Sequence, residues 1–294
     1  MEALKKVTQI KDRILDIGII KFVMRVFQEF GVDGGTNLAA GISYYAFLAM
    51  FPLILAFIGL LGFFLPSGMI QEQLFGFFRD NIPGAVNVLE GNIQNVINLR
   101  GTLGIIGILG LLWAGSGVIS AVSNAINRAW DIQKEIPFYL KKPRDIGLTI
   151  GLGLLFFLSL GSVIIFNYVP VEGIPIIGSE LAQALLRVIA FFVAWSIFLI
   201  LFKVIPNTRT YWRYVWFGSL VTAVLFEIGR ALIFFYLNNF VNYQMVYGSI
   251  ASVIALLVWI YYSAIIVIIG AELTAEYGRM RRGIGRGLHS HSTT

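Results

Sequence analysis

The chain has 294 residues, of which 57% are hydrophobic and 13% are charged, and its net charge at neutral pH is +6. Soluble domains carry about 25% charged residues, so this deficit, together with long apolar runs, excludes an ordinary soluble domain and indicates a polytopic α-helical membrane protein. The chain has no cysteine, which excludes disulfides, cysteine-ligated zinc and a thiol nucleophile.

Residues 1–36 are predicted to form a cytoplasmic segment with an amphipathic helix at the membrane interface. From Leu15 onward apolar residues recur at helical spacing, and polar residues fall largely on the other face. Basic side chains at such a position face anionic lipid head groups. A soluble helix packed on the cytoplasmic loops is the alternative. The basic residues of the segment are Lys5, Lys6, Lys11, Arg13, Lys21 and Arg25.

Six apolar runs follow, each long enough to cross a bilayer, which needs about 20 residues. The predicted spans are approximately 38–65, 102–127, 146–169, 183–205, 214–237 and 250–269. Between the first two, apolar residues at helical spacing predict short amphipathic helices in the outer 66–102 connection. The expected fold is all-α, with six transmembrane helices in one bundle over residues 37–278 and a basic, disordered cytoplasmic tail at 279–294.

The distribution of Lys and Arg orients these spans. Most of the 22 basic residues lie in four segments, whereas the opposite connections hold only Arg79 and Arg100. The positive-inside rule therefore places both termini in the cytoplasm. This topology also accounts for the positive net charge, so no nucleic-acid partner is expected. The four cytoplasmic segments are 1–36, 128–145, 203–213 and 279–294.

Small residues indicate where helices approach one another closely. The second span is predicted to be a close-packing helix because it carries many glycines. The third span contains a Gly147-x-x-x-Gly151 pair, whose spacing also suits helix packing, although such pairs are common. The glycines of the second span are Gly104, Gly107, Gly110, Gly115 and Gly117.

Several stretches together resemble the YihY/BrkB family of bacterial membrane proteins, which is often labelled ribonuclease BN. The resemblance implies a six-span cytoplasmic-membrane protein, and the family's links to envelope lipid biology and serum resistance favour transport. The stretches, spread from the first span to the last, are Ala39-Ala40-Gly41-Ile42-Ser43-Tyr44-Tyr45, Pro52, Trp113, Asn127-x-x-Trp130, Pro206, Tyr247-Gly248-Ser249, Trp259-x-Tyr261 and Gly270-Ala271-Glu272.

Glu227 and Arg230 are the most informative charges, because they lie on one face of the fifth span. At about 1.5 Å per residue, Glu227 is roughly 20 Å from the start of that span, near mid-membrane. A charge there costs at least about 2.5–3.5 kcal/mol. Either the pair neutralises itself as a structural element, or it lines a hydrated substrate path. Arg187 begins the neighbouring span on the same side, and two arginines with one carboxylate suit an anionic group.

A second polar group is predicted near the inner ends of the spans. Glu272 either pairs with a local arginine or contributes to an inner vestibule, and the side chains near the inner end of the first span either line that vestibule or anchor at the interface. The vestibule candidates are Ser43, Tyr44, Tyr45, Asn124, Asn127, Arg128 and Glu272.

The sequence favours a transporter or translocator of an amphiphilic, anionic substrate such as a lipid. A ribonuclease needs a metal cluster or a positioned acid and base, but the only histidines, His289 and His291, lie in the terminal tail. No P-loop motif is present, and we expect no cofactor and no metal. Membrane lipids are the expected partners and a homo-oligomer is left open. A membrane-bound ribonuclease and a non-transporting envelope scaffold are the alternatives.

Overall fold

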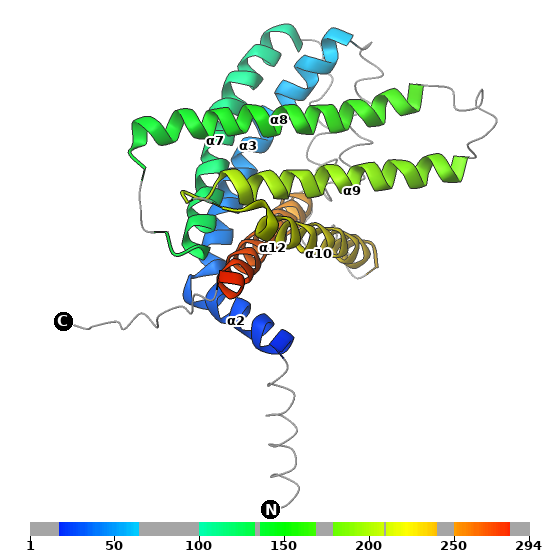
Figure 1. Ribbon diagram of the computed structural model, residues 1–294. Helices are drawn as coiled ribbons and strands as arrows, with labels where there is room; N and C mark the ends of the chain where they lie inside the picture. The colour runs from blue at the N-terminus through cyan, green and yellow to red at the C-terminus, as the bar shows by residue number, and fades with distance from the viewer. Residues whose placement is uncertain are drawn as a thin grey trace, which may run out of the picture.

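The computed structural model describes residues 18–64, 100–132, 136–168, 179–208, 210–239 and 250–282. Within these ranges the regular structure is seven α-helices, which confirms the all-α prediction for the described residues. The helices, labelled as in Figure 1, are α2 (Gly18–Val32), α3 (Gly35–Phe64), α7 (Arg100–Ala129), α8 (Phe138–Tyr168), α9 (Ser179–Val204), α10 (Trp212–Asn239) and α12 (Ile250–Arg282).

Among the described residues, four helices are long and apolar enough to cross a membrane, and they match the first, second, fifth and sixth predicted spans. Helices α8 and α9 cover the third and fourth predicted spans, but the described part of α9 holds a shorter apolar helix, Val188–Val204. The six-span bundle therefore stays a prediction for α8 and α9. The four membrane-capable stretches are Gly35–Ala56, Ile105–Ala129, Trp212–Ile233 and Val253–Arg281.

Several expectations lie outside the described residues. They include the short helices of the 66–102 connection up to residue 99, the first 17 residues and the tail after residue 282. Helix α12 runs without a break to Arg282, so Arg279 and Arg281 belong to this helix rather than to a separate tail. The interfacial position of the N-terminal segment and the domain limits stay predictions.

A sharp turn joins α2 to α3 and directs Asp33 toward the bundle. Helix α2 ends at Val32, and Gly34 adopts a φ of 66°, a left-handed conformation that glycine tolerates best. The Asp33 amide donates to the Glu29 carbonyl at 2.8 Å, which closes the last turn of the helix. Helix α2 then packs on α12, and Val26 is buried.

Helices α3 and α7 lie side by side and make the most extensive helix contact among the described helices (Figure 1). Glycine makes this approach possible: a Cβ atom at Gly107 would lie 2.4 Å from the backbone nitrogen of Ala56. At Gly117 it would lie 3.0 Å from the Tyr45 ring. These contacts confirm the prediction that the second span is a close-packing helix. Figure 1 also shows α8 and α9 crossing α3 and α7 steeply.

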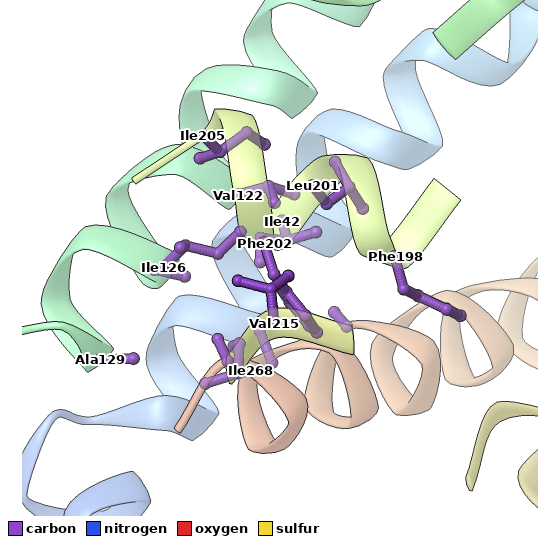
Figure 2. Close-up of a cluster of buried hydrophobic side chains, with 14 of the residues drawn as sticks. Ile42, Val122, Ile126, Ala129, Phe198, Leu201, Phe202, Ile205, Val215 and Ile268 are labelled. Atoms are coloured by element: carbon purple, nitrogen blue, oxygen red, sulfur yellow. The ribbon is translucent and has the colours of Figure 1, made fainter. Parts of the chain in front are cut away.

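The hydrophobic core lies where the ends of five helices meet (Figure 2). Phe202 and Ile205, at the end of α9, are fully buried there, together with Ile126 of α7 and Ile268 of α12. The core thus fixes the positions of the polar residues around it, which come from the same helix ends. Other members are Ile42, Val122, Ala129, Phe198, Leu201 and Val215.

Candidate functional site

A cavity of about 590 Å³ lies between α3, α7 and α8. Its volume falls within the range of about 300–1,000 Å³ that is usual for small-molecule sites. Most of its wall is apolar or aromatic, and Trp113 and Phe138 are exposed, so the cavity opens at the surface of the protein. Its charged residues are Lys141, Lys142 and Asp145, which leave one positive charge in excess.

Both lysines of the cavity are held in place by α7. The Lys142 ammonium donates to Ser116 Oγ at 2.6 Å and lies 4.5 Å from the centre of the Trp113 ring. The Lys141 ammonium donates to Asn124 Oδ1 at 2.9 Å. Because an ammonium has three donors and each lysine has one described oxygen acceptor, both retain hydrogens for an anionic ligand.

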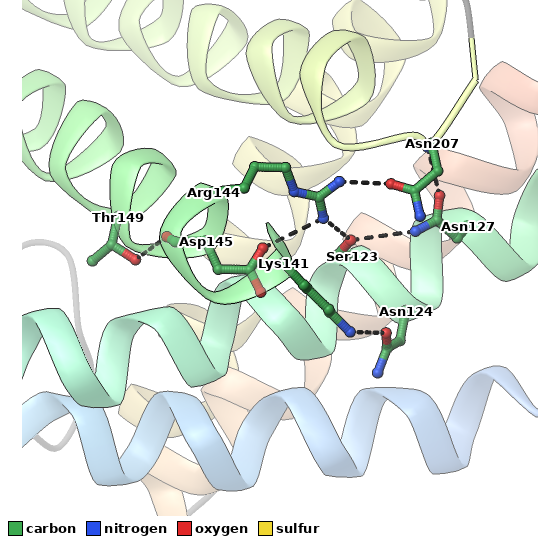
Figure 3. A network of polar contacts seen from close by, with 8 residues as sticks. All are labelled: Ser123, Asn124, Asn127, Lys141, Arg144, Asp145, Thr149 and Asn207. Carbon is green, nitrogen blue, oxygen red and sulfur yellow. Dashed lines mark hydrogen bonds and ion pairs between the residues drawn. The ribbon is translucent and has the colours of Figure 1, made fainter. Parts of the chain in front are cut away.

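A polar network beside the cavity joins α7, α8 and the segment after α9 (Figure 3). Arg144 donates through Nη1 to Asn207 Oδ1 at 2.6 Å and through Nη2 to Ser123 Oγ at 2.9 Å. The Asn207 amide donates to Asn127 Oδ1 at 2.8 Å. Asp145 is buried and lies 3.4 Å from Arg144. The network holds the first turns of α8, and therefore both cavity lysines, against α7.

The predicted vestibule residues do not form one group. Tyr45 and Asn124 line the cavity, whereas Asn127 belongs to the neighbouring network. Ser43 is buried and donates to the carbonyl oxygen of Ala39 in its own helix, so it is not available to a ligand. Arg128 and Glu272 belong to a separate charged cluster, and Tyr44 is exposed without lining the cavity.

Glu227 and Arg230 form an ion pair on α10, with 2.6 Å between Glu227 Oε2 and Arg230 Nη2. Both side chains are about one third exposed, at 30% and 33% respectively. They do not line the cavity between α3, α7 and α8. Arg187 lies in α9, but its side chain falls outside those that the structure describes, so the predicted three-residue group stays a prediction.

A charged cluster lies where α2, the end of α7 and α12 meet. Arg279 binds Asp131 at 2.7 Å and Glu276 at 3.0 Å, and Glu276 also contacts Arg25 at 3.4 Å. Asp131 reaches Arg279 because it adopts a left-handed conformation, with a φ of 56°, just after α7 ends. The cluster ties α12 to α7 and to α2.

Asp33 is one of three buried acids in the described part of this region, together with Glu272 and Glu276. Burial raises the pKa of its carboxyl above the ordinary value, while its contact with the Glu272 carboxyl and the charges of Arg128 and Arg279 act in the opposite direction. Glu272 was expected either to pair with a local arginine or to join the vestibule. Instead, its oxygens have no hydrogen-bond partner among the described residues, and its carboxyl faces Asp33.

Comparison with known proteins decides the family. The family model described as virulence factor BrkB matches residues 26–292. The chain belongs to the virulence factor BrkB family. The chain is 30% identical over 255 residues to a UPF0761 membrane protein of Pseudoalteromonas atlantica. The aligned region covers 82% of this chain and 81% of the relative. No solved structure matches the chain.

Two further relatives extend this comparison across the BrkB family. A UPF0761 membrane protein of Aeromonas salmonicida is 27% identical over 91% of this chain and 92% of its own length. A protein of Bacillus subtilis named putative ribonuclease-like protein YfkH is 26% identical over 87% of this chain and 94% of its own length. In the described part of the chain, no three His, Cys, Asp or Glu residues form a group suited to a metal ion.

Sequence reasoning treated three basic residues in and beside this cavity only as topological charges. Lys141, Lys142 and Arg144 served to place a loop in the cytoplasm, but the structure puts them in α8, facing α7. Asp33 received no role at all. One available signal was Trp113, an isolated tryptophan in a glycine-rich helix, because a lysine ammonium binds favourably to a tryptophan ring and Lys142 lies 4.5 Å from the centre of this one.

Proposed function

We propose that this BrkB-family protein binds an anionic amphiphile, of the class of membrane lipids, in the cavity between α3, α7 and α8, and moves it across the inner membrane. The observation that carries the proposal is the pairing of two lysines with an apolar, aromatic wall in one cavity. Basic pockets between membrane helices on the cytoplasmic side suit anionic lipid head groups.

The contacts assign a role to each part of the cavity. Lys141 and Lys142 bind the anionic head group through their remaining hydrogens. Trp113 and Leu48 lie in the apolar wall and contact the acyl chains. The opening at the surface allows a lipid to enter sideways, without leaving the bilayer. In the proposed orientation both termini are cytoplasmic, so the lysines lie near the inner leaflet.

The intramembrane pair on α10 is proposed as the next polar step for the head group. Glu227 and Arg230 neutralise one another at rest, and a passing anion competes with Glu227 for the guanidinium. Arg187 is proposed to add a second cation on the same route. No nucleic acid is involved in this function, and association into homo-oligomers is compatible with it.

Lipid binding tests the cavity. In nanodiscs or in mixed micelles, the Lys141→Gln, Lys142→Gln double variant should bind a fluorescent anionic phospholipid about tenfold more weakly, which corresponds to a loss of about 1.4 kcal/mol. Binding of a zwitterionic phospholipid should be weak in both proteins. The matched control is Lys21→Gln, which removes an exposed lysine of α2 outside the cavity. Equal binding of both lipids, or no effect of the double variant, overturns the proposal.

Translocation tests the pair on α10. In proteoliposomes, the Glu227→Leu, Arg230→Leu double variant should remain folded and still bind lipid, but should lose translocation. Arg187→Ala should give a similar loss, and Arg230→Lys should retain part of the activity, because lysine keeps the charge without the planar fork. Lipid binding without translocation in the unmodified protein identifies a scaffold. RNA cleavage that a substitution in this chain abolishes identifies a ribonuclease.

A further inference from the structure

Two acidic side chains far apart in the sequence meet at one end of the bundle. Asp33 lies in the turn between α2 and α3, and Glu272 lies in α12, which packs against both helices. Each carboxyl group contributes to the electrostatic environment of the other, so the two lie near one another. This pair lies outside the lining of the lipid cavity, and its role does not depend on the proposed transport.

Both acids are removed from water, and three of their four carboxyl oxygens lack a donor among the described residues. Asp33 is 8% exposed and Glu272 is 1% exposed. Asp33 Oδ2 and both carboxyl oxygens of Glu272 have no hydrogen-bond partner among the described residues. Buried polar atoms in folded proteins are nearly always hydrogen-bonded, so a donor for these oxygens has to be identified. Two facing carboxylates cannot supply it, because an ionised carboxylate only accepts hydrogen bonds.

The nearby arginines are engaged with other groups. Arg279 directs its donors to Asp131, Glu276 and the carbonyl oxygen of Ala129. Arg25 contacts Glu276. Arg128 is exposed and acts on Asp33 through its charge. No charged residue of α3 takes part, since this helix carries none, and its titratable side chains Tyr44 and Tyr45 are both exposed.

The charges of the cluster do not balance when every acid is ionised. Its four carboxylates would then outnumber its three guanidinium groups. The guanidinium groups of Arg25 and Arg128 are exposed, so the buried part of the cluster would hold three carboxylates and only the guanidinium group of Arg279. A single proton restores the balance of the whole cluster and also supplies the missing hydrogen-bond donor. The carboxylates belong to Asp33, Asp131, Glu272 and Glu276, and the guanidinium groups belong to Arg25, Arg128 and Arg279.

We propose that Asp33 and Glu272 form a proton-binding site, in which one proton is shared between the two buried carboxyl groups and joins the α2–α3 turn to α12. Like charges at such short range cannot both ionise, and one acid of the pair then holds its proton at pH values where an isolated acid is ionised. The proton belongs to the pair rather than to either residue.

Release of this proton weakens the contact between α2 and α12. Two buried carboxylates then repel one another across the junction, and water or a cation has to enter to solvate them. Gly34, with its positive φ, is the point where α2 can change direction relative to α3. The site therefore makes the docking of α2 sensitive to pH on this side of the membrane.

Infrared spectroscopy of the full-length protein detects the proton directly. In a detergent without ester groups, the carbonyl stretch of a protonated carboxyl group is separate from the carboxylate and amide bands. The unmodified protein should show this band at neutral pH and lose it in alkaline buffer. Asp33→Asn and Glu272→Gln should each lack the band at neutral pH, because three carboxylates then balance three arginines and the new amide supplies donors.

A matched control and a cation series complete the test. Glu227→Gln should keep the band, because the carboxylate of Glu227 is already paired with Arg230. Replacing Na⁺ by choline at constant pH should leave the band unchanged. Absence of the band in the unmodified protein at neutral pH overturns the proposal, and this measurement requires no variant. The proposal also fails if either single variant keeps the band, or if Na⁺ displaces it at constant pH.

Discussion

Helices α10 and α12 pack through two reciprocal contacts between glycine and threonine, and these contacts give the sharpest prediction about stability. A Cβ atom at Gly218 would lie 1.9 Å from Thr274 Oγ1 and 3.0 Å from Thr274 Cα. A Cβ atom at Gly270 would lie 2.0 Å from Thr222 Oγ1. Each threonine hydroxyl donates at 2.7 Å to the carbonyl oxygen of the glycine in its own helix, so neither side chain turns away without losing a hydrogen bond.

Replacement of Gly218 by Ala should therefore destabilise the protein. Overpacking costs about 1–3 kcal/mol, and a displaced Thr274 hydroxyl loses a hydrogen bond worth about 1 kcal/mol. The better helix propensity of Ala returns about 1 kcal/mol. The net loss is about 2 kcal/mol, which lowers the thermal midpoint by about 3 °C in a chain of 294 residues, because the unfolding entropy grows with chain length.

Thermal unfolding in detergent, followed by circular dichroism, measures this loss. The matched control is Gly147→Ala in α8, because a Cβ atom there meets no described atom within 4 Å. This control should be as stable as the unmodified protein or slightly more stable, since only helix propensity changes. Adding Thr274→Ala to Gly218→Ala should recover part of the loss. If Gly218→Ala has an unchanged midpoint, the argument from close packing is refuted.

Two further predictions concern the charged cluster. Arg279→Gln should lower the free energy of unfolding by about 3 kcal/mol, because it leaves Asp131 and Glu276 without their buried partner. Chemical denaturation measures this loss. In the exposed control Arg281→Gln the free energy of unfolding should be nearly unchanged. The raised pKa of Asp33 means that the folded protein retains a proton that the unfolded chain releases, so stability is fully present below the ordinary pKa of 3.8 and is lost as the pH rises through the raised pKa. The thermal midpoint should therefore fall as the pH rises above 3.8, and this fall should be smaller in Asp33→Asn. A midpoint that does not differ in its pH dependence between the two proteins contradicts the raised pKa of this acid.

The sequence by itself determined the class of the protein. Long apolar runs and the scarcity of charge are local properties, and they predicted an all-α membrane protein whose first, second, fifth and sixth spans correspond to membrane-capable helices. The glycines of the second span likewise predicted close packing, which Gly107 confirms against α3. These features depend on length, composition and spacing, which need no knowledge of the partner helix.

Only the tertiary structure showed which helices pack against one another. Gly147 and Gly151 have the spacing of a packing motif but meet no described neighbour, whereas Gly218 and Gly270 provide the close approach of α10 and α12. The spacing of glycines indicates that one face of a helix is small and flat. It does not indicate which other helix packs against that face.

The same limit applied to the charged residues. Lys142 had the same sequence signature as any loop lysine until the fold placed it against Ser116 and Trp113. Asp33 and Glu272 acquire their shared environment only because a turn at Gly34 brings α2 back onto α12. Burial and mutual repulsion are properties of the assembled helices. The charge state of this pair therefore depends on how the helices pack, and neither segment determines it alone.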